Sequence, residues 1–194
     1  MKELNEKQLI KWLGMICILA GIARMGMTPT SIIWGTDSPQ ELTFGFIACV
    51  LMAVGTIVTY MVQSRETGVA GFITTLLIIV ANIITGAMVW SLFAAGPGAP
   101  MPEGPLVNIS RLIMMAGLMG GSLVFAILTF RAKVFPRWVP ALLILMLVNI
   151  FLPVADNKFF AAFWGLAYVG MGYCVWAGKL NAGAAARKDG TLSA

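Results

Sequence analysis

Long uncharged runs alternate with short charged clusters along this chain. A helix rises 1.5 Å per residue, and about 20 apolar residues cross roughly 30 Å of hydrocarbon. Four runs have the length of one crossing: residues 42–64, 112–130, 138–155 and 159–178. A fifth run, residues 67–102, ends in a segment rich in Pro and Gly, so we expect its helix to stop near Ala95.

The first apolar run is the shortest. Only 12 residues, Trp12 to Ala23, separate Lys11 from Arg24. They form a span if both long cationic side chains reach the membrane interface. The alternative is a signal peptide cleaved after Ala23, with the small residues Gly21 and Ala23 at the cleavage site. The apolar residues after Arg24 favour a retained helix.

These runs predict an all-α membrane protein, a bundle of six transmembrane helices. None of the loops is long enough to fold alone, so residues 1–179 form a single transmembrane domain and residues 180–194 a flexible cytoplasmic tail. The helices are expected at about residues 9–27, 42–63, 69–95, 106–130, 138–153 and 159–178.

Composition supports a membrane location. The chain of 194 residues is 59% hydrophobic and only 11% charged, with a mean hydropathy of +0.90, which is too apolar for a soluble domain. A net charge of +5 could indicate a nucleic-acid partner. The cations lie between apolar runs, however, so no nucleic-acid binding is expected.

The distribution of charge predicts the orientation. If six helices alternate, the N-terminus, residues 63–68, residues 131–137 and the tail share one face, which carries +6, and the other face carries −1. By the positive-inside rule both termini are cytoplasmic. Arg131, Lys133 and Arg137 lie on that cytoplasmic face, so we interpret them as an orientation signal and not as a ligand site.

Several kinds of chemistry have no sequence support. The chain contains no His, and its three Cys lie in apolar runs without a C-x-x-C pair, so no metal or other cofactor is expected. No G-x-S-x-G, H-E-x-x-H or P-loop motif occurs, and no acidic residue lies within a predicted span. We therefore assign no catalytic residue. An enzyme of lipid metabolism stays an alternative if a carboxylate at the outer rim acts: Asp37, Glu41, Glu103 or Asp156.

Arg24 and Arg111 are the strongest candidates for binding a ligand, because both lie at the outer ends of their helices, against the charge rule. One interpretation is that they snorkel and pair with external carboxylates such as Glu41 or Glu103. The other is an outward-facing vestibule in which both arginines hold an anion such as a lipid headgroup.

Asn82 and Asn149 lie within apolar helices and need hydrogen-bond partners there. They can bond to neighbouring helices, or they can line a polar cavity together with Thr74, Thr75 and Thr85. The sequence does not decide between these interpretations.

Small residues recur at the spacing of helix contacts. Gly117-x-x-x-Gly121 and Ala161-x-x-x-Gly165 allow two backbones to approach closely. We expect most of this packing within one chain. The Gly117/Gly121 face could also contact a second copy or another membrane protein.

Two short motifs resemble small bacterial membrane proteins of the domain-of-unknown-function kind. They are FPRW at residues 135–138, ahead of the fifth helix, and WAGK at residues 176–179, ending the sixth. The resemblance covers about residues 130–179. It implies a bacterial cytoplasmic membrane, and it supplies no activity and no site residues.

These observations favour a non-enzymatic integral membrane protein, either an accessory subunit or a binder of an apolar or lipid ligand. A small facilitative transporter or channel is the main alternative. No convincing inverted repeat supports transport.

Overall fold

The computed structural model describes residues 5–96, 100, 103–150 and 159–181. In these residues all regular structure is helical. The helices are α1 (Glu6–Trp34), α2 (Pro39–Met61), α3 (Ser64–Ala95), α4 (Pro105–Met115), a π-helical segment η1 (Ala116–Gly121), α5 (Ser122–Ala132), α6 (Trp138–Ile150) and α7 (Phe160–Trp176). Because α4, η1 and α5 follow one another without a break, the chain has six helices in its described part, as predicted.

Four of these helices are long and apolar enough to cross a membrane: α1, α2, α3 and the continuous helix Pro105–Ala132. The prediction of six span-length helices is wrong for the last two. The described part of α6 has 13 residues and α7 has 17, which correspond to about 20 and 26 Å. The uncharged run overestimates the length of α7, because the helix ends at Trp176, before the next charged residue, Lys179. The predicted end of the fifth helix, residues 151–153, lies outside the described residues.

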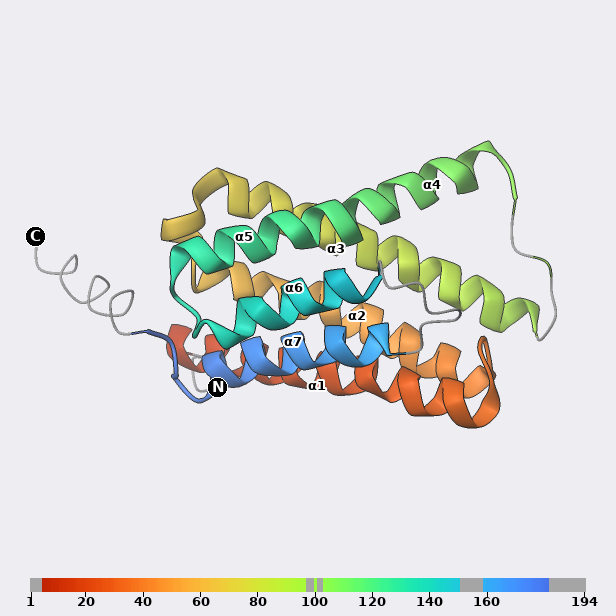
Figure 1. The fold of residues 1–194 in the computed structure, drawn as a ribbon, viewed down its shortest axis with the longest axis horizontal. Coiled ribbons are helices and arrows are strands. Elements are labelled where there is room, and N and C mark those ends of the chain that lie inside the picture. The colour runs from red at the N-terminus through yellow and green to blue at the C-terminus, as the bar shows by residue number, and fades with distance from the viewer. Residues whose placement is uncertain (1–4, 97–99, 101–102, 151–158, 182–194) are drawn as a thin grey trace, which may run out of the picture.

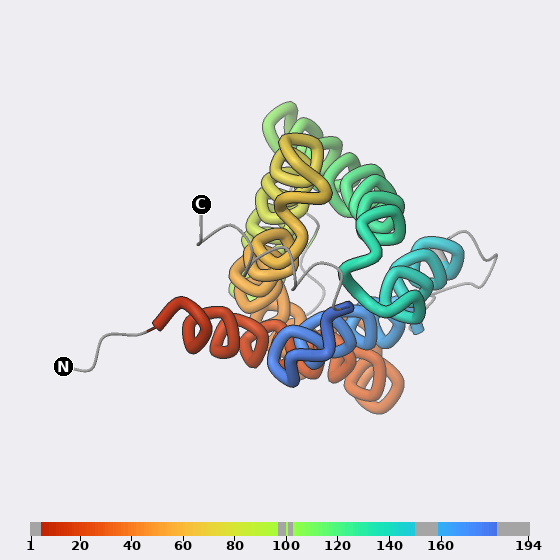
Figure 2. Tube along the Cα trace, turned by 90° about the vertical axis from the view of Figure 1, so that its left-hand side faces the viewer, coloured from red at the N-terminus to blue at the C-terminus, as the bar shows by residue number. Residues whose placement is uncertain are grey.

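The six helices form a closed ring. Each helix contacts the next in sequence, and α1 contacts α7 to close the ring. The end-on view in Figure 2 shows this order around the molecule. The two neighbours of α1 in the ring, α2 and α7, also contact each other.

The helices run alternately up and down. The start of α1, the turn between α2 and α3, the loop between α5 and α6 and the end of α7 lie at the left-hand end of Figure 1. The sequence predicted this grouping from the alternation of six helices. That this end is cytoplasmic stays a prediction, and residues 182–194 of the predicted tail lie outside the described residues.

Local sequence explains two unusual helix features. α1 continues through Pro29, and the Thr30 hydroxyl donates to the carbonyls of Gly26 (2.8 Å) and Met27 (3.0 Å) beside it, as hydroxyls often do near proline in apolar helices. At the start of α3, Gly68 adopts φ 54° and ψ −145°, a conformation that only glycine adopts readily.

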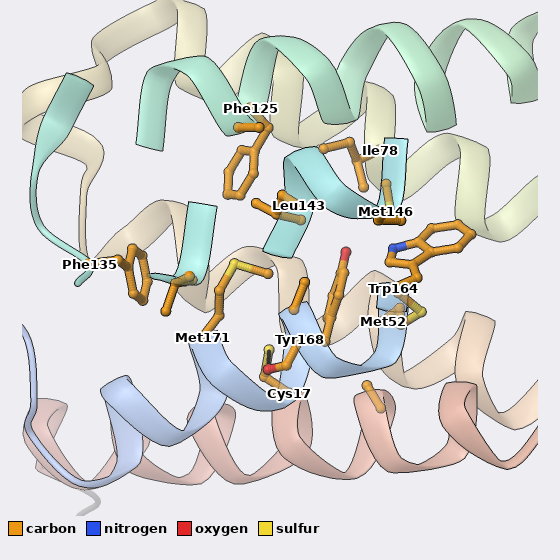
Figure 3. Packing of buried hydrophobic residues seen from close by; sticks show 14 of the residues in the cluster. Cys17, Met52, Ile78, Phe125, Phe135, Leu143, Met146, Trp164, Tyr168 and Met171 are labelled. Atoms are coloured by element: carbon orange, nitrogen blue, oxygen red, sulfur yellow. Dashed lines mark hydrogen bonds between the residues drawn. The ribbon is translucent and has the colours of Figure 1, made fainter. Parts of the chain in front are cut away.

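Large apolar side chains fill the centre of the ring. Trp164 and Tyr168 of α7 lie beside Met52 of α2 and Met146 of α6 in Figure 3, and Met171 lies further along α7. All five are at most 4% exposed. The exposed apolar residues lie on the outer surfaces of the same helices, as expected for a protein whose surroundings are lipid.

Candidate functional site

The helices α3 and α4 enclose a groove because they cross closely at one point and then separate. A methyl group built on Gly117 would lie 2.5 Å from the Leu77 carbonyl oxygen and 2.6 Å from the Ala81 Cβ. From this crossing, α4 and the C-terminal half of α3 diverge toward the right of Figure 1. The close approach requires glycine, and it fixes where the groove begins.

The groove has a volume of about 600 Å³ and an almost entirely apolar lining. α4 buries none of its residues, and Leu106 and Met115, which line the groove, are 76% and 52% exposed. One wall comes from Ile84, Thr85, Ala87, Met88, Val89, Ser91 and Leu92 of α3, and the other from Leu106, Val107, Ser110, Arg111, Met114 and Met115 of the α4 helix. We call this set of residues the α3–α4 groove.

Arg111 supplies the charge in this lining. Thr85 and Ser91 are also polar, but their hydroxyls donate to the carbonyls of Ala81 and Met88 in their own helix, both at 2.7 Å. The groove is therefore an apolar channel with a cation on one wall. A guanidinium has five donors in a planar fork, so it can serve several acceptors at once.

Arg24 lies elsewhere, between α1 and α7. Its guanidinium carbon is 4.2 Å from the centroid of the Trp164 ring, and its side chain is only 7% exposed. Its Nε atom is buried and has no hydrogen-bond partner among the described residues. α1 continues for ten residues beyond Arg24, to Trp34, so this cation is not at the helix end where the sequence placed it.

The two arginines therefore take part in different helix pairs. Arg24 packs against α7, and Arg111 faces α3. Arg24 contacts the Trp164 ring, whereas Arg111 lines the α3–α4 groove. The joint binding of one anion by both arginines stays a prediction.

The predicted acidic partners lie at the start of α2 and before α4. Glu41 Oε2 accepts a hydrogen bond from the Asp37 amide at 2.8 Å, and the Ser38 hydroxyl accepts from the Glu41 amide at 3.3 Å. This reciprocal arrangement caps α2. Glu41 also attracts Arg24 electrostatically. Glu103 is exposed, and Asp156 lies outside the described residues.

Asn82 of α3 is buried. Its Nδ2 donates to the Ile78 carbonyl at 2.9 Å, whereas its Oδ1 is buried and has no partner in the described part of the chain. Asn149 is also buried, in α6. The predicted cavity residues separate: Thr74 and Thr75 are buried with Asn82, and Thr85 lines the α3–α4 groove.

Two hydrogen-bonded pairs of buried polar groups were not predicted. The Thr56 and Tyr168 hydroxyls are 2.7 Å apart, and Gln63 Nε2 donates to the Thr129 hydroxyl at 3.1 Å. The Gln63 Oε1 atom and the Thr75 hydroxyl have no partner within the described residues. The Thr56–Tyr168 and Gln63–Thr129 pairs each join residues more than 60 positions apart, so no local pattern could have predicted them.

The Gly117/Gly121 face, which the sequence offered to a partner, contacts α3 within the same chain. A methyl group on Gly121 would lie 3.1 Å from Ile78. Homo-oligomerisation stays a prediction, but this face is occupied in the single chain.

Comparisons with known proteins give no relative for this chain: no family model, no curated protein and no solved structure matches it. The resemblance of residues 130–179 to bacterial membrane proteins therefore stays an expectation. Among the described residues, no group of three potential metal ligands occurs.

Proposed function

We propose that this protein binds a membrane lipid in the α3–α4 groove, with an acyl chain along the groove and an anionic headgroup at Arg111. The observation that carries the proposal is the groove itself, an apolar space of about 600 Å³ between two span-length helices. Because the groove lies between helices that can cross a membrane, membrane lipid can reach it.

The composition of the groove matches an amphiphile. An acyl chain contacts methionine and leucine side chains without leaving polar atoms unpaired, whereas a polar solute would lose its hydration on these walls. Methionine adapts to irregular chains because it is unbranched and flexible. Met88, Met114 and Met115 all line the groove.

Arg111 favours a ligand with an anionic end. It lies six residues after Pro105, where α4 begins, which places it about 9 Å along the helix. A long cationic side chain at this depth can reach the headgroup level and pair with a phosphate. An anionic lipid therefore satisfies both the apolar walls and the charge.

Lipid retention by variants tests this function. The groove is filled in Ala87→Trp and loses its charge in Arg111→Gln. Ile83→Trp is the matched control, because Ile83 is 59% exposed on α3 and does not line the groove. After purification in mild detergent, mass spectrometry should find a stoichiometric lipid on the wild type and on Ile83→Trp, and less on both groove variants. Equal lipid on all four proteins would reject the function.

Facilitated transport is the second candidate, and the buried polar atoms without partners favour it. Gln63 Oε1, Thr75 Oγ1 and Asn82 Oδ1 are buried and have no partner among the described residues, and such atoms are usually satisfied by water or by another polar group. Flux of a small polar solute in liposomes, lost in Asn82→Leu, would support this candidate. Flux equal to that of empty liposomes would reject it.

A further inference from the structure

A second cavity lies where α5 turns into α6, at the other end of the continuous helix from the α3–α4 groove. Lys133 ends α5 in a left-handed conformation, with φ 57° and ψ 16°. The cavity has a volume of about 200 Å³ and is lined by Phe130, Lys133, Phe135, Arg137, Pro140 and Asn181. We call it the loop pocket.

The wall of the loop pocket is held in place from both sides. Asn181 Nδ2 donates to the carbonyls of Lys133 (2.7 Å) and Phe135 (3.3 Å), and the Asn181 amide donates to the Val134 carbonyl at 2.9 Å. Below the loop, the Val134 and Phe135 side chains are 0% and 1% exposed. The backbone that carries the two cations is therefore fixed between the core and the segment after α7.

The loop pocket is positively charged. Lys133 and Arg137 both line it, and none of its lining residues is acidic. Together they offer an ammonium and a guanidinium to one small volume, which is the arrangement that binds phosphate oxygens. An orientation signal requires only that cations lie on this face. It does not require that two of them share a cavity whose backbone is fixed.

An exposed aromatic residue lines the pocket. Phe130, in the last turns of α5, is 53% exposed. Trp138, at the start of α6, is 47% exposed, and its ring packs against Gly170 of α7. Aromatic side chains beside cations at a helix end are typical of the level of the lipid headgroups. A ligand that contacts both the cations and the Phe130 ring is amphiphilic, so a lipid fits the surroundings better than free phosphate.

We propose that the loop pocket binds the phosphate of an anionic glycerophospholipid, with an acyl chain lying along Phe130. Lys133 and Arg137 contact the phosphate oxygens, and Asn181 positions the loop. This site is independent of the α3–α4 groove. Arg111 and Lys133 are separated by 22 residues of continuous helix and its cap, or roughly 33 Å, so variants of one site leave the other unchanged.

The test is native mass spectrometry in non-ionic detergent, titrated with short-chain phosphatidylglycerol. The full chain carries Ala87→Trp in every sample, because this substitution fills the α3–α4 groove and leaves the loop pocket as the lipid site that is measured. The variant Lys133→Gln/Arg137→Gln should bind about 30-fold more weakly, because each interfacial cation is worth about 1 kcal/mol and 1.4 kcal/mol is tenfold in affinity. The matched control is Lys7→Gln/Lys11→Gln, which removes the same charge from exposed residues at the same end of the molecule. The control should bind as Ala87→Trp alone does.

A second variant tests the geometry without changing the charge. Asn181→Ala removes the two side-chain bonds to the loop, to the carbonyls of Lys133 and Phe135, and should also weaken binding of phosphatidylglycerol. Phosphatidylcholine of the same chain length should bind weakly to every protein. Equal loss in the Lys7/Lys11 control would overturn the proposal in favour of diffuse charge attraction. Inorganic phosphate that displaces the lipid at equal concentration would overturn it in favour of a free-phosphate site. Unchanged binding in both pocket variants would also overturn it.

Discussion

Gly21 of α1 and Gly165 of α7 are so close that a methyl group built on either one would contact the backbone carbonyl of the other. The contact repeats two helical turns away, where a methyl group on Gly172 would lie 2.6 Å from the Gly14 carbonyl oxygen. The two helices therefore pack backbone to backbone. This contact closes the ring, and it attaches α7, which is shorter than a membrane span, to the long helix α1.

Gly165→Ala should destabilise the protein. The added methyl group has no space against α1, and overpacking of this kind typically costs about 1–3 kcal/mol. Thermal unfolding in detergent, followed by circular dichroism, measures the effect as a lower melting temperature. Gly120→Ala is the control, because nothing lies within 4 Å of a methyl group there. It should be neutral or stabilising by up to about 1 kcal/mol. Equal effects of the two substitutions would contradict the packing.

The sequence predicted part of this contact. Ala161-x-x-x-Gly165 was recognised as a packing face, and Gly165 does lie at a helix contact. Gly14 and Gly21 are seven residues apart, a spacing of two turns that the four-residue motif does not include. Their partner helix is about 150 residues away, so only the folded chain shows which glycine faces which.

Arg24 and Trp164 should be energetically coupled. A desolvated cation–π contact is worth about 0.5–2 kcal/mol. In a double-mutant cycle, Trp164→Leu should therefore lower the free energy of unfolding by about 0.5–2 kcal/mol more in the protein that has Arg24 than in the Arg24→Met variant. Arg24→Met alone should be neutral or stabilising, because it removes a buried cation whose Nε has no partner among the described residues. Additive effects would contradict the coupling.

The position of Arg24 shows where sequence reasoning was insufficient. The predicted helix ended near residue 27, so Arg24 was expected to reach water at the helix end. α1 instead continues through Pro29 to Trp34, since a proline is tolerated in an apolar helix when hydroxyls and neighbouring helices satisfy the backbone. The number and order of helices followed from the apolar runs. The α3–α4 groove did not, because it depends on a close crossing at Gly117.

Arg111→Gln should reduce the preference of the protein for anionic lipid. Losing about 1 kcal/mol of charge attraction corresponds to an affinity for phosphatidylglycerol about fivefold lower. Binding of phosphatidylcholine should change little, since the apolar walls remain. Native mass spectrometry with both lipids gives the ratio. Arg111→Lys should restore part of it, and an unchanged ratio in Arg111→Gln would show that Arg111 does not contact the headgroup.

Lys179 should stabilise the end of α7 only while it is protonated. Its Nζ donates to the Tyr173 hydroxyl at 2.6 Å, and this bond raises the pKa of Lys179 above its ordinary value of 10.5. The contribution is complete below the pKa of the unfolded chain and is lost as the pH rises through the higher folded pKa. The difference in melting temperature between the wild type and Tyr173→Phe should therefore stay constant between about pH 6 and pH 9. It should shrink above 10.5. A difference that shrinks near neutral pH would contradict this assignment.

The most direct test of lipid binding in the α3–α4 groove is to map where a lipid with a photoreactive acyl chain attaches. The protein is labelled in a bilayer, digested and analysed by mass spectrometry. We expect labels concentrated on the groove walls, at residues 84–92 and 106–115, and lost from both segments in Ala87→Trp. Labels spread evenly over the other exposed apolar surfaces, such as Ile47, Val69 and Ile127, and unchanged in Ala87→Trp would contradict the proposed function.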